Sequence, residues 1–119
     1  MNILIAEDDE MVQMLMEICM SILEWDFILV EDGKQAVDRC KTSNFDAILM
    51  DTMMPVLNGI EASKQIREFN KVIPIIAVSS HADYETQMDY VKAGVNAFMA
   101  KPFTEVEIEA VITKLLAAG

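Results

Sequence analysis

Hydrophobic residues along the chain fall into five short runs, separated by longer segments in which apolar positions recur every three or four residues. The runs are residues 2–6, 27–30, 47–50, 73–78 and 97–100. Each has the length of a β-strand and little polar alternation, which indicates strands covered on both faces. The segments between them have the periodicity of amphipathic helices. Strands that alternate with helices predict an α/β fold with a doubly wound, five-stranded parallel sheet and five helices in three layers.

Capping side chains mark where the predicted helices begin. The expected helices cover residues 10–24, 34–41 and 59–69, a segment that reaches Lys92, and a last segment after Thr104. Asp32 and Gly33 precede the second helix, and Asn58 and Asp83 stand at the N-cap positions of the third and fourth helices. Thr104 and Glu107 have the spacing of a capping box, which opens the last helix. In that helix we expect a core stripe that includes Val106, Val111 and Leu115.

The first predicted helix carries two apolar stripes instead of one. One stripe, which is sufficient to pack the helix on the sheet, consists of Val12, Leu15, Met16, Cys19 and Leu23. The second stripe consists of Met11, Met14, Ile18 and Ile22. This second stripe is either additional core or an exposed surface on which a partner docks, and the pattern leaves both interpretations open.

Composition and charge narrow the possible functions. The 119 residues, 53% of them hydrophobic and 24% charged, suit one globular domain over residues 1–119 with no separate output domain. The net charge of -11 repels nucleic acid, so we expect no nucleic-acid partner. The same charge disfavours self-association, so we expect a monomer before any modification. Cys19 and Cys40 lack metal-binding spacing and are expected to be reduced thiols. No apolar run approaches the roughly 18 residues of a membrane span and no leader is visible, which predicts a cytoplasmic protein without membrane contact.

Charged and polar residues suited to metal binding or catalysis directly follow the predicted strands. Glu7 and Asp8 come after the first run, Asp51 after the third, Ser79 after the fourth and Lys101 after the fifth. In the strand order 2-1-3-4-5, these side chains meet on one rim at the carboxyl ends of the strands. Crowded carboxylates favour a bound cation, and oxygen ligands of this kind suit Mg²⁺. With a lysine and a hydroxyl beside them, they predict phosphoryl transfer onto an aspartate.

Three segments identify the family that the chain resembles. The run DTMMPVLNG from Asp51 resembles the D-x-x-M-P-x-x-[DN]-G motif of response-regulator receiver domains in two-component signalling. The run GVNAFMAKPF from Gly94 resembles their G-A-x-x-[YF]-x-x-K-P-F motif, and EDGKQA from Glu31 resembles their turn into the second helix. The resemblance extends from the first strand to the last helix and implies a single-domain receiver with a flavodoxin-like fold.

The resemblance also implies roles for individual residues. Asp51 would accept the phosphoryl group, and Mg²⁺ or Mn²⁺ would be held by Asp8, Asp51 and the backbone carbonyl of Met53, with Glu7 behind these ligands. Lys101, followed by a cis bond to Pro102, would balance the phosphoryl charge. Asp9 lies outside the acidic pair, and we interpret it as a helix N-cap.

Switching and phosphoryl lifetime depend on positions at which this chain differs from the commonest family pattern. Ser79 and Phe98 would form the switch, with Ser79 in place of the frequent Thr and Phe98 in place of the frequent Tyr. Losing the tyrosine hydroxyl reduces the difference in hydrogen bonding between the two switch states. Met53 and His81 stand where the family tunes hydrolysis of the aspartyl phosphate. His81 is either an exposed loop imidazole or a group that acts on that hydrolysis.

The resemblance implies a signalling module, and not an enzyme, with intrinsic autophosphorylation and slow autodephosphorylation at Asp51. Its partners would be a histidine kinase or histidine phosphotransfer protein, docked on the first helix, and a downstream protein target. An aspartate-based phosphatase of the haloacid dehalogenase type would need a D-x-D motif on the first strand. A flavodoxin-like electron carrier would need a phosphate loop where Glu7 and Asp8 stand. A receiver scaffold that takes no phosphate is the third alternative, although Asp51, Asp8 and Lys101 are all present.

Overall fold

The computed structural model describes residues 1–80 and 83–118, and in this part of the chain strands and helices alternate throughout. Their order is β1 (Asn2–Ala6), α1 (Glu10–Leu23), β2 (Asp26–Val30), α2 (Gly33–Thr42), β3 (Ala47–Asp51), α3 (Gly59–Phe69), β4 (Ile75–Ser79), α4 (Tyr84–Lys92), β5 (Ala97–Ala100) and α5 (Glu105–Ala118). The five strands form one parallel sheet in the order β2-β1-β3-β4-β5. The predicted α/β class, strand order and element order are therefore confirmed.

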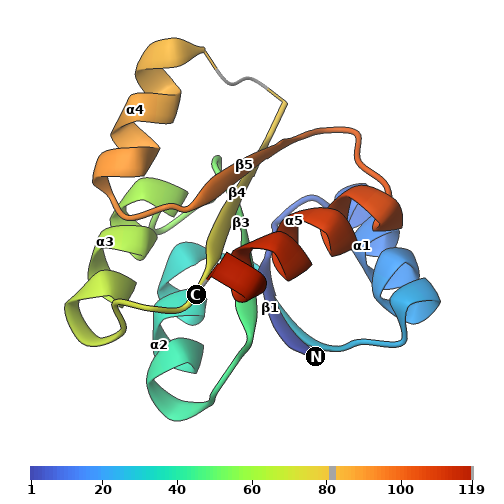
Figure 1. The fold of residues 1–119 in the computed structure, drawn as a ribbon. Coiled ribbons are helices and arrows are strands. Elements are labelled where there is room, and N and C mark those ends of the chain that lie inside the picture. The colour runs from blue at the N-terminus through green and yellow to red at the C-terminus, as the bar shows by residue number, and fades with distance from the viewer. Residues whose placement is uncertain (81–82, 119) are drawn as a thin grey trace.

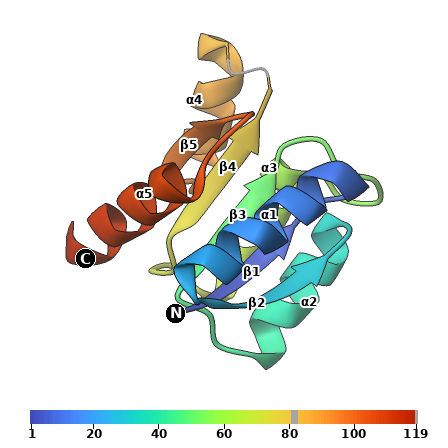
Figure 2. The same cartoon turned by 90° about the vertical axis from the view of Figure 1, so that its right-hand side faces the viewer.

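The helices cover the two faces of the sheet in two groups. Helices α1 and α5 lie on one face, and α2, α3 and α4 lie on the other (Figure 1). The view turned by 90° shows α1 and α5 beside each other in front of the strands (Figure 2). The three central strands β1, β3 and β4 are covered on both faces, as in Ile3 and Leu4 of β1, which are both fully inaccessible. The edge strands β2 and β5 are only partly buried, contrary to the expectation for all five strands, because each has a neighbouring strand on one side only.

The cap predictions are confirmed by side-chain hydrogen bonds. Asp9 Oδ1 accepts the backbone N–H groups of Met11 and Val12 at 2.8 and 3.2 Å, at the start of α1. The same kind of bond starts the other helices at Asp32, Asn58, Asp83 and Thr104. These bonds satisfy N–H groups that have no partner within the helix, and so they fix where each helix begins.

Two expectations about individual elements are wrong. The fourth strand begins at Ile75 and not at residue 73, because Pro74 has no N–H to donate to a neighbouring strand. Val106 is 67% exposed, whereas Ile108 and Ile112 are the buried residues of α5. Two residues along a helix correspond to a rotation of about 200°, so Val106 lies on the side opposite to Ile108.

The second stripe of α1 lies on the surface. Met11, Met14, Ile18 and Ile22 are between 54% and 80% exposed, whereas Met16 and Cys19 of the first stripe are buried against the sheet. Of the two interpretations left open by the sequence, additional core is therefore excluded. Cys19 and Cys40 are both free thiols, as predicted. Among the described residues, no helix has the length and apolar character needed to cross a membrane.

Candidate functional site

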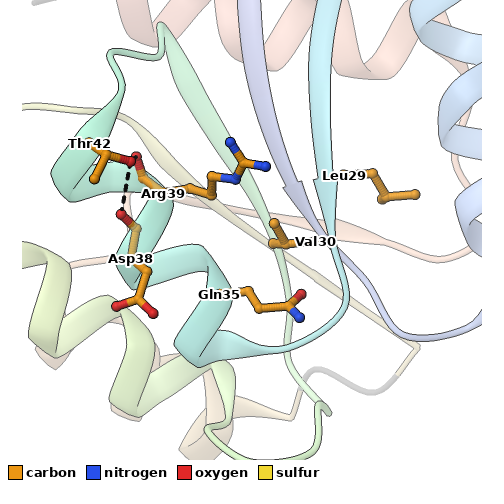
Figure 3. A pocket seen from close by; sticks show the side chains of 6 residues that line it. All are labelled: Leu29, Val30, Gln35, Asp38, Arg39 and Thr42. Carbon is orange, nitrogen blue, oxygen red and sulfur yellow. Dashed lines mark hydrogen bonds between the residues drawn. The ribbon is translucent and has the colours of Figure 1, made fainter.

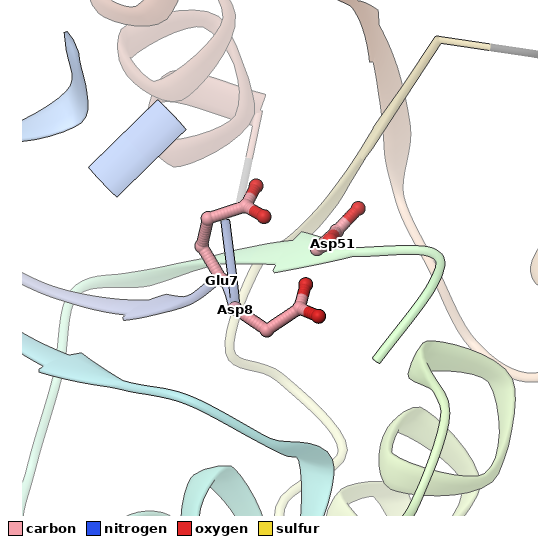
Figure 4. Close-up of side chains that lie close together, drawn as sticks. All are labelled: Glu7, Asp8 and Asp51. Carbon is pink, nitrogen blue, oxygen red and sulfur yellow. The ribbon is translucent and has the colours of Figure 1, made fainter. Parts of the chain in front are cut away.

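Three carboxylates meet where the chain leaves β1 and β3. Glu7 and Asp8 directly follow β1, and Asp51 is the last residue of β3. One carboxylate oxygen from each lies within 4.8 Å of the other two, and Figure 4 shows the side chains gathered at the ends of the two strands. Glu7 and Asp51 are buried, whereas Asp8 is exposed. The parallel pairing of β1 with β3 produces this cluster, because it places both strand ends on the same rim.

Lys101 lies between the two buried carboxylates. Its Nζ is 3.1 Å from Glu7 Oε1 and donates a hydrogen bond to Asp51 Oδ1 at 3.2 Å. Its backbone N–H donates to the carbonyl of Ser79 at 3.0 Å, which ties the end of β5 to β4, and its peptide bond to Pro102 is cis. Burial acts to lower the pKa of Lys101, but the charges of Asp51 and Glu7 outweigh burial and raise that pKa above its ordinary value.

Glu7 is held in an environment that disfavours its charge. Burial is the main cause, followed by the adjacent Asp51, and together they raise the pKa of Glu7 to about 7. The N–H group of Asp9, 3.2 Å from Glu7 Oε2, and the ammonium of Lys101 act in the opposite direction. Without a metal, this cluster therefore binds a proton at a pH where an ordinary glutamate is ionised.

The elevated pKa of Glu7 predicts how the stability of the metal-free protein depends on pH. Because the pKa is 4.5 when exposed and about 7 when folded, Glu7 stabilises the fold fully below pH 4.5 and loses this contribution as pH rises through about 7. Relative to Glu7→Gln, the free energy of unfolding should fall by about 3 kcal/mol across this window. Urea unfolding in chelator at several pH values measures the difference. A constant difference between the two proteins would contradict the prediction.

The segment after β3 is held by hydrogen bonds to the last residue of β3 and to β4. The N–H of Met53 donates to Asp51 Oδ1 at 3.4 Å, and the N–H of Thr52 donates to the carbonyl of Val78 at 3.3 Å. The Met53 side chain is 79% exposed, so any ligand that Met53 supplies to this site has to come from its backbone. Its assignment as a metal ligand through the carbonyl remains a prediction.

The two residues predicted to form a switch lie next to the cluster. Ser79 ends β4, is buried, and helps to line a cavity of about 530 Å³ together with Met53, Met54 and Tyr90. Phe98 of β5 is half-buried and packs edge to face on the Tyr90 ring, with ring centres 6.0 Å apart. His81, the second residue predicted to tune hydrolysis, lies outside the described residues. The switch roles of Ser79 and Phe98 remain predictions.

The exposed stripe on α1 borders a shallow hollow. Its members Met14, Ile18 and Ile22 line about 350 Å³ of open space together with Glu17 and Ser21. Another pocket, of about 480 Å³, lies between the edge strand β2 and α2 (Figure 3). It is lined by Leu29, Val30, Gln35, Asp38, Arg39 and Thr42 and includes none of the predicted site residues.

Two residues at the site were missed by the sequence analysis. The Gln13 side-chain amide donates to the carbonyl of Glu7 at 2.6 Å, which ties α1 to the end of β1. The Tyr90 hydroxyl donates to the carbonyl of Thr52 at 2.9 Å, which ties α4 to the residue after Asp51. Both contacts join side chains to backbone carbonyls of another element. No residue pattern in either helix distinguishes such a contact from ordinary surface or core positions.

Comparisons with known proteins agree with this arrangement. The family model described as "Response regulator receiver domain" matches residues 3–113. Chemotaxis protein CheY from Halobacterium salinarum is 33% identical over 120 residues, which cover 98% of each chain. Hybrid signal transduction histidine kinase I from Dictyostelium discoideum is 37% identical over 110 residues, 85% of this chain. Two-component response regulator 24 from Arabidopsis thaliana is 39% identical over 88 residues, 73% of this chain.

The solved structures include a receiver of the same shape. The receiver domain of sensor histidine kinase PA1611 from Pseudomonas aeruginosa PAO1 has a TM-score of 0.91, is 34% identical, and covers 98% of this chain and 97% of its own. Its magnesium ion is described as coordinated in the active site cleft. The matches cover only 6% of the Dictyostelium kinase and 63% of the Arabidopsis regulator. The sheet order, the acidic rim and the match over residues 3–113 together show that the chain belongs to the response regulator receiver domains, the phosphoacceptor modules of two-component signalling.

Proposed function

We propose that Asp51 accepts a phosphoryl group from a phosphohistidine on a histidine kinase or histidine phosphotransfer protein. The observation that carries this assignment is the position of Asp51, buried at the end of β3 beside two other carboxylates and hydrogen-bonded to Lys101 at 3.2 Å. A carboxylate in this setting is a nucleophile with a cation already beside it. Residues 1–119 act as one receiver unit in this proposal, in the cytoplasm and as a monomer before phosphorylation.

The donor groups at the rim fit a divalent cation. Asp8 and Asp51 would supply carboxylate oxygens, with Glu7 in the same cluster. The backbone carbonyl of Met53, two residues after Asp51, would supply a third oxygen. All are hard oxygen ligands, which Mg²⁺ and Mn²⁺ prefer, and the exposed Asp8 leaves room for water and phosphate. When bound, such an ion neutralises charge on the transferring phosphoryl group. The PA1611 receiver, which holds magnesium in its active site cleft, supports this assignment.

The transfer itself needs little from the protein beyond position and charge. An Asp51 carboxylate oxygen attacks phosphorus, the P–N bond to the imidazole breaks, and its electron pair stays on the imidazole nitrogen. The ammonium of Lys101, already 3.2 Å from Asp51 Oδ1, attracts the phosphoryl oxygens as charge spreads over them. The same groups allow uptake from a small phosphodonor, and water slowly reverses the modification by hydrolysing the acyl phosphate.

Phosphorylation changes the surface of the domain through Ser79 and Phe98. The acyl phosphate adds close to two negative charges beside Ser79, whose hydroxyl is drawn toward the phosphoryl oxygens. Phe98 then moves into the space that Ser79 vacates, and the face formed by α4, β5 and α5 is altered. A downstream protein reads that face. The position of Ser79 in β4, paired with Ala100 of β5, supports this route.

Met53 and His81 set the lifetime of the phosphoryl group in this proposal. Met53 cannot orient a water molecule, whereas an imidazole at position 81 can. His81→Ala should therefore lengthen the half-life of the phosphorylated protein by about three-fold or more, within the range of acid–base effects. The half-life is measured by intact mass after the phosphodonor is removed. An unchanged half-life would exclude a kinetic role for His81.

The exposed stripe on α1, formed by Met11, Met14, Ile18 and Ile22, is proposed as the surface on which the phosphohistidine protein docks. Ile18→Asp should lower the rate of transfer from a histidine phosphotransfer protein by about ten-fold, because a charge replaces an apolar contact. Uptake from acetyl phosphate should stay at the wild-type rate. Val72→Asp, at a position 87% exposed beyond the end of α3, is the matched control. Equal losses with both donors would contradict docking on this stripe.

Acetyl phosphate tests the proposed function without a protein partner. Incubated with it and Mg²⁺, the protein should gain the mass of one phosphoryl group, and a chelator should prevent the gain. The proposal fails if no gain occurs under conditions in which calorimetry shows Mg²⁺ bound.

A further inference from the structure

Tyr90 connects α4 to the segment that follows the acceptor aspartate. Its side chain is buried, with 2% of the residue exposed, and its hydroxyl donates to the carbonyl of Thr52 at 2.9 Å. Thr52 is the residue next to Asp51, and 38 positions separate it from Tyr90. A buried carbonyl satisfied by one distant side chain depends on that side chain for its orientation.

The peptide between Thr52 and Met53 is held at both of its polar ends. Its carbonyl accepts the bond from Tyr90, and its N–H, which belongs to Met53, donates to Asp51 Oδ1 at 3.4 Å. The carbonyl and the N–H of a planar trans peptide point in opposite directions. Fixing the carbonyl toward Tyr90 therefore directs the N–H toward the acceptor carboxylate.

The surroundings of Tyr90 keep its hydroxyl in this place. The ring packs against Phe98 with planes at 87°, and it forms one wall of the 530 Å³ cavity that Ser79 and Met54 also line. A Cβ added at Gly59 would lie 3.2 Å from the hydroxyl and 2.6 Å from the carbonyl oxygen of Asp51, so the glycine leaves the space that this contact occupies.

The Tyr90 hydroxyl also stays protonated. Burial, followed by the negative charge of Asp51, raises the pKa of Tyr90 to about 12, although the bond to Thr52 acts in the opposite direction. The group is therefore a donor across the whole range in which receivers work.

We propose that Tyr90 is a positioning residue for the acceptor site, and that its hydroxyl orients the Thr52–Met53 peptide toward Asp51. The inference rests on the proposed function, because that function makes Asp51 the acceptor and the Met53 carbonyl a metal ligand. The carbonyl of Met53 is the next group along the chain, so a displaced Thr52–Met53 peptide also displaces it. Metal affinity is thus the quantity that should respond to loss of the hydroxyl.

Tyr90→Phe removes the hydroxyl and keeps the ring. Titration with Mg²⁺ alone, followed by calorimetry at a temperature where both proteins are fully folded, should show affinity weakened by about three- to ten-fold, since one hydrogen bond no longer holds the ligand segment. Amide hydrogen exchange at Met53 should become faster by a similar factor. Tyr84→Phe, at a position 78% exposed at the start of α4, is the matched control and should match the wild type in both measurements.

A rescue separates positioning from a purely structural role. Incorporation of 4-aminophenylalanine at position 90 restores a donor at the same point of the ring, and it should return Mg²⁺ affinity to within about two-fold of the wild type, as a donor hydrogen bond is regained. If Tyr90→Phe lowers only the melting temperature while Mg²⁺ affinity and exchange at Met53 stay at wild-type values, the proposal is overturned.

The result is separable from the proposed function. If the wild type binds Mg²⁺ but gains no phosphoryl group, the proposed function fails, while the comparison of Tyr90→Phe with the wild type still decides the role of Tyr90. If the wild type binds no Mg²⁺, hydrogen exchange at Met53 decides the role of Tyr90. Equal exchange in the wild type and Tyr90→Phe would then overturn the proposal.

Discussion

Replacing Lys101 by alanine is expected to slow phosphoryl uptake from acetyl phosphate by about 100-fold or more, the usual cost of removing one preorganised charge-stabilising donor. Its Nζ lies 3.1 Å from Glu7 Oε1 and 3.2 Å from Asp51 Oδ1, so it is the cation next to the proposed acceptor. The rate is measured by intact mass over time at saturating Mg²⁺. Lys92→Ala, which removes an exposed lysine at the end of α4, is the matched control and should keep the wild-type rate.

The same change should also disturb the acidic cluster. Lys101 lowers the pKa of Glu7, so its removal should raise that pKa further above the value of about 7. In Lys101→Ala the loss of stability with rising pH should therefore extend to higher pH than in the wild type. An uptake rate within three-fold of the wild type would contradict the role assigned to Lys101, whatever the effect on stability.

Gly33→Ala is expected to lower the free energy of unfolding by about 3 kcal/mol, at the upper end of overpacking costs. The new Cβ would lie 2.1 Å from the carbonyl oxygen of Leu57 and 3.1 Å from the Cβ of Ala62. The obstacle is a backbone atom that also accepts the Gly33 N–H at 3.1 Å, so the segment between β3 and α3 has to move. Phosphoryl uptake should also slow, because residues 52–58 link Asp51 to that contact.

Urea unfolding in chelator measures this stability change. Lys34→Ala, on the next residue of α2, is the matched control, because it removes only an exposed ion pair with Asp38 and should cost less than about 1 kcal/mol. If Gly33→Ala unfolds at the same urea concentration as the wild type, the close approach of α2 to the 52–58 segment is not a constraint on the fold.

The strand ends are the part of the site that the sequence predicts well. Glu7, Asp51 and Lys101 each follow an apolar run, and parallel strands place such residues on one rim whatever lies between them. The burial that raises the pKa of Glu7 to about 7 could not be predicted, because it depends on how closely Asp51 and the surrounding backbone pack around it. The position of these residues on one rim follows from the order of strands and helices along the chain. The pKa of each group depends on the packing around it, which the sequence pattern does not show.

The sequence predicts less well which helix positions are exposed and which side chains form hydrogen bonds with residues far away in the chain. The pattern of α1 shows two apolar stripes but not whether the second is additional core or exposed surface, and only the packing shows that Ile18 and Ile22 are exposed. Val106 fits a broadly defined apolar stripe in α5, but it is exposed because Ile108 and Ile112 form the buried face of the helix. Tyr90 lies in a short helix and bonds to a carbonyl 38 residues earlier, a contact that no local pattern encodes.

Locating the phosphoryl group shows directly whether Asp51 is the residue that accepts it. The protein is incubated with acetyl phosphate and Mg²⁺ and reduced with borohydride, which converts an aspartyl phosphate to homoserine, and its peptides are then sequenced by mass spectrometry. Homoserine is expected at position 51, and none is expected anywhere in Asp51→Asn treated in the same way. Homoserine at Asp8, or a borohydride-resistant phosphoryl group on Ser79, would contradict this assignment.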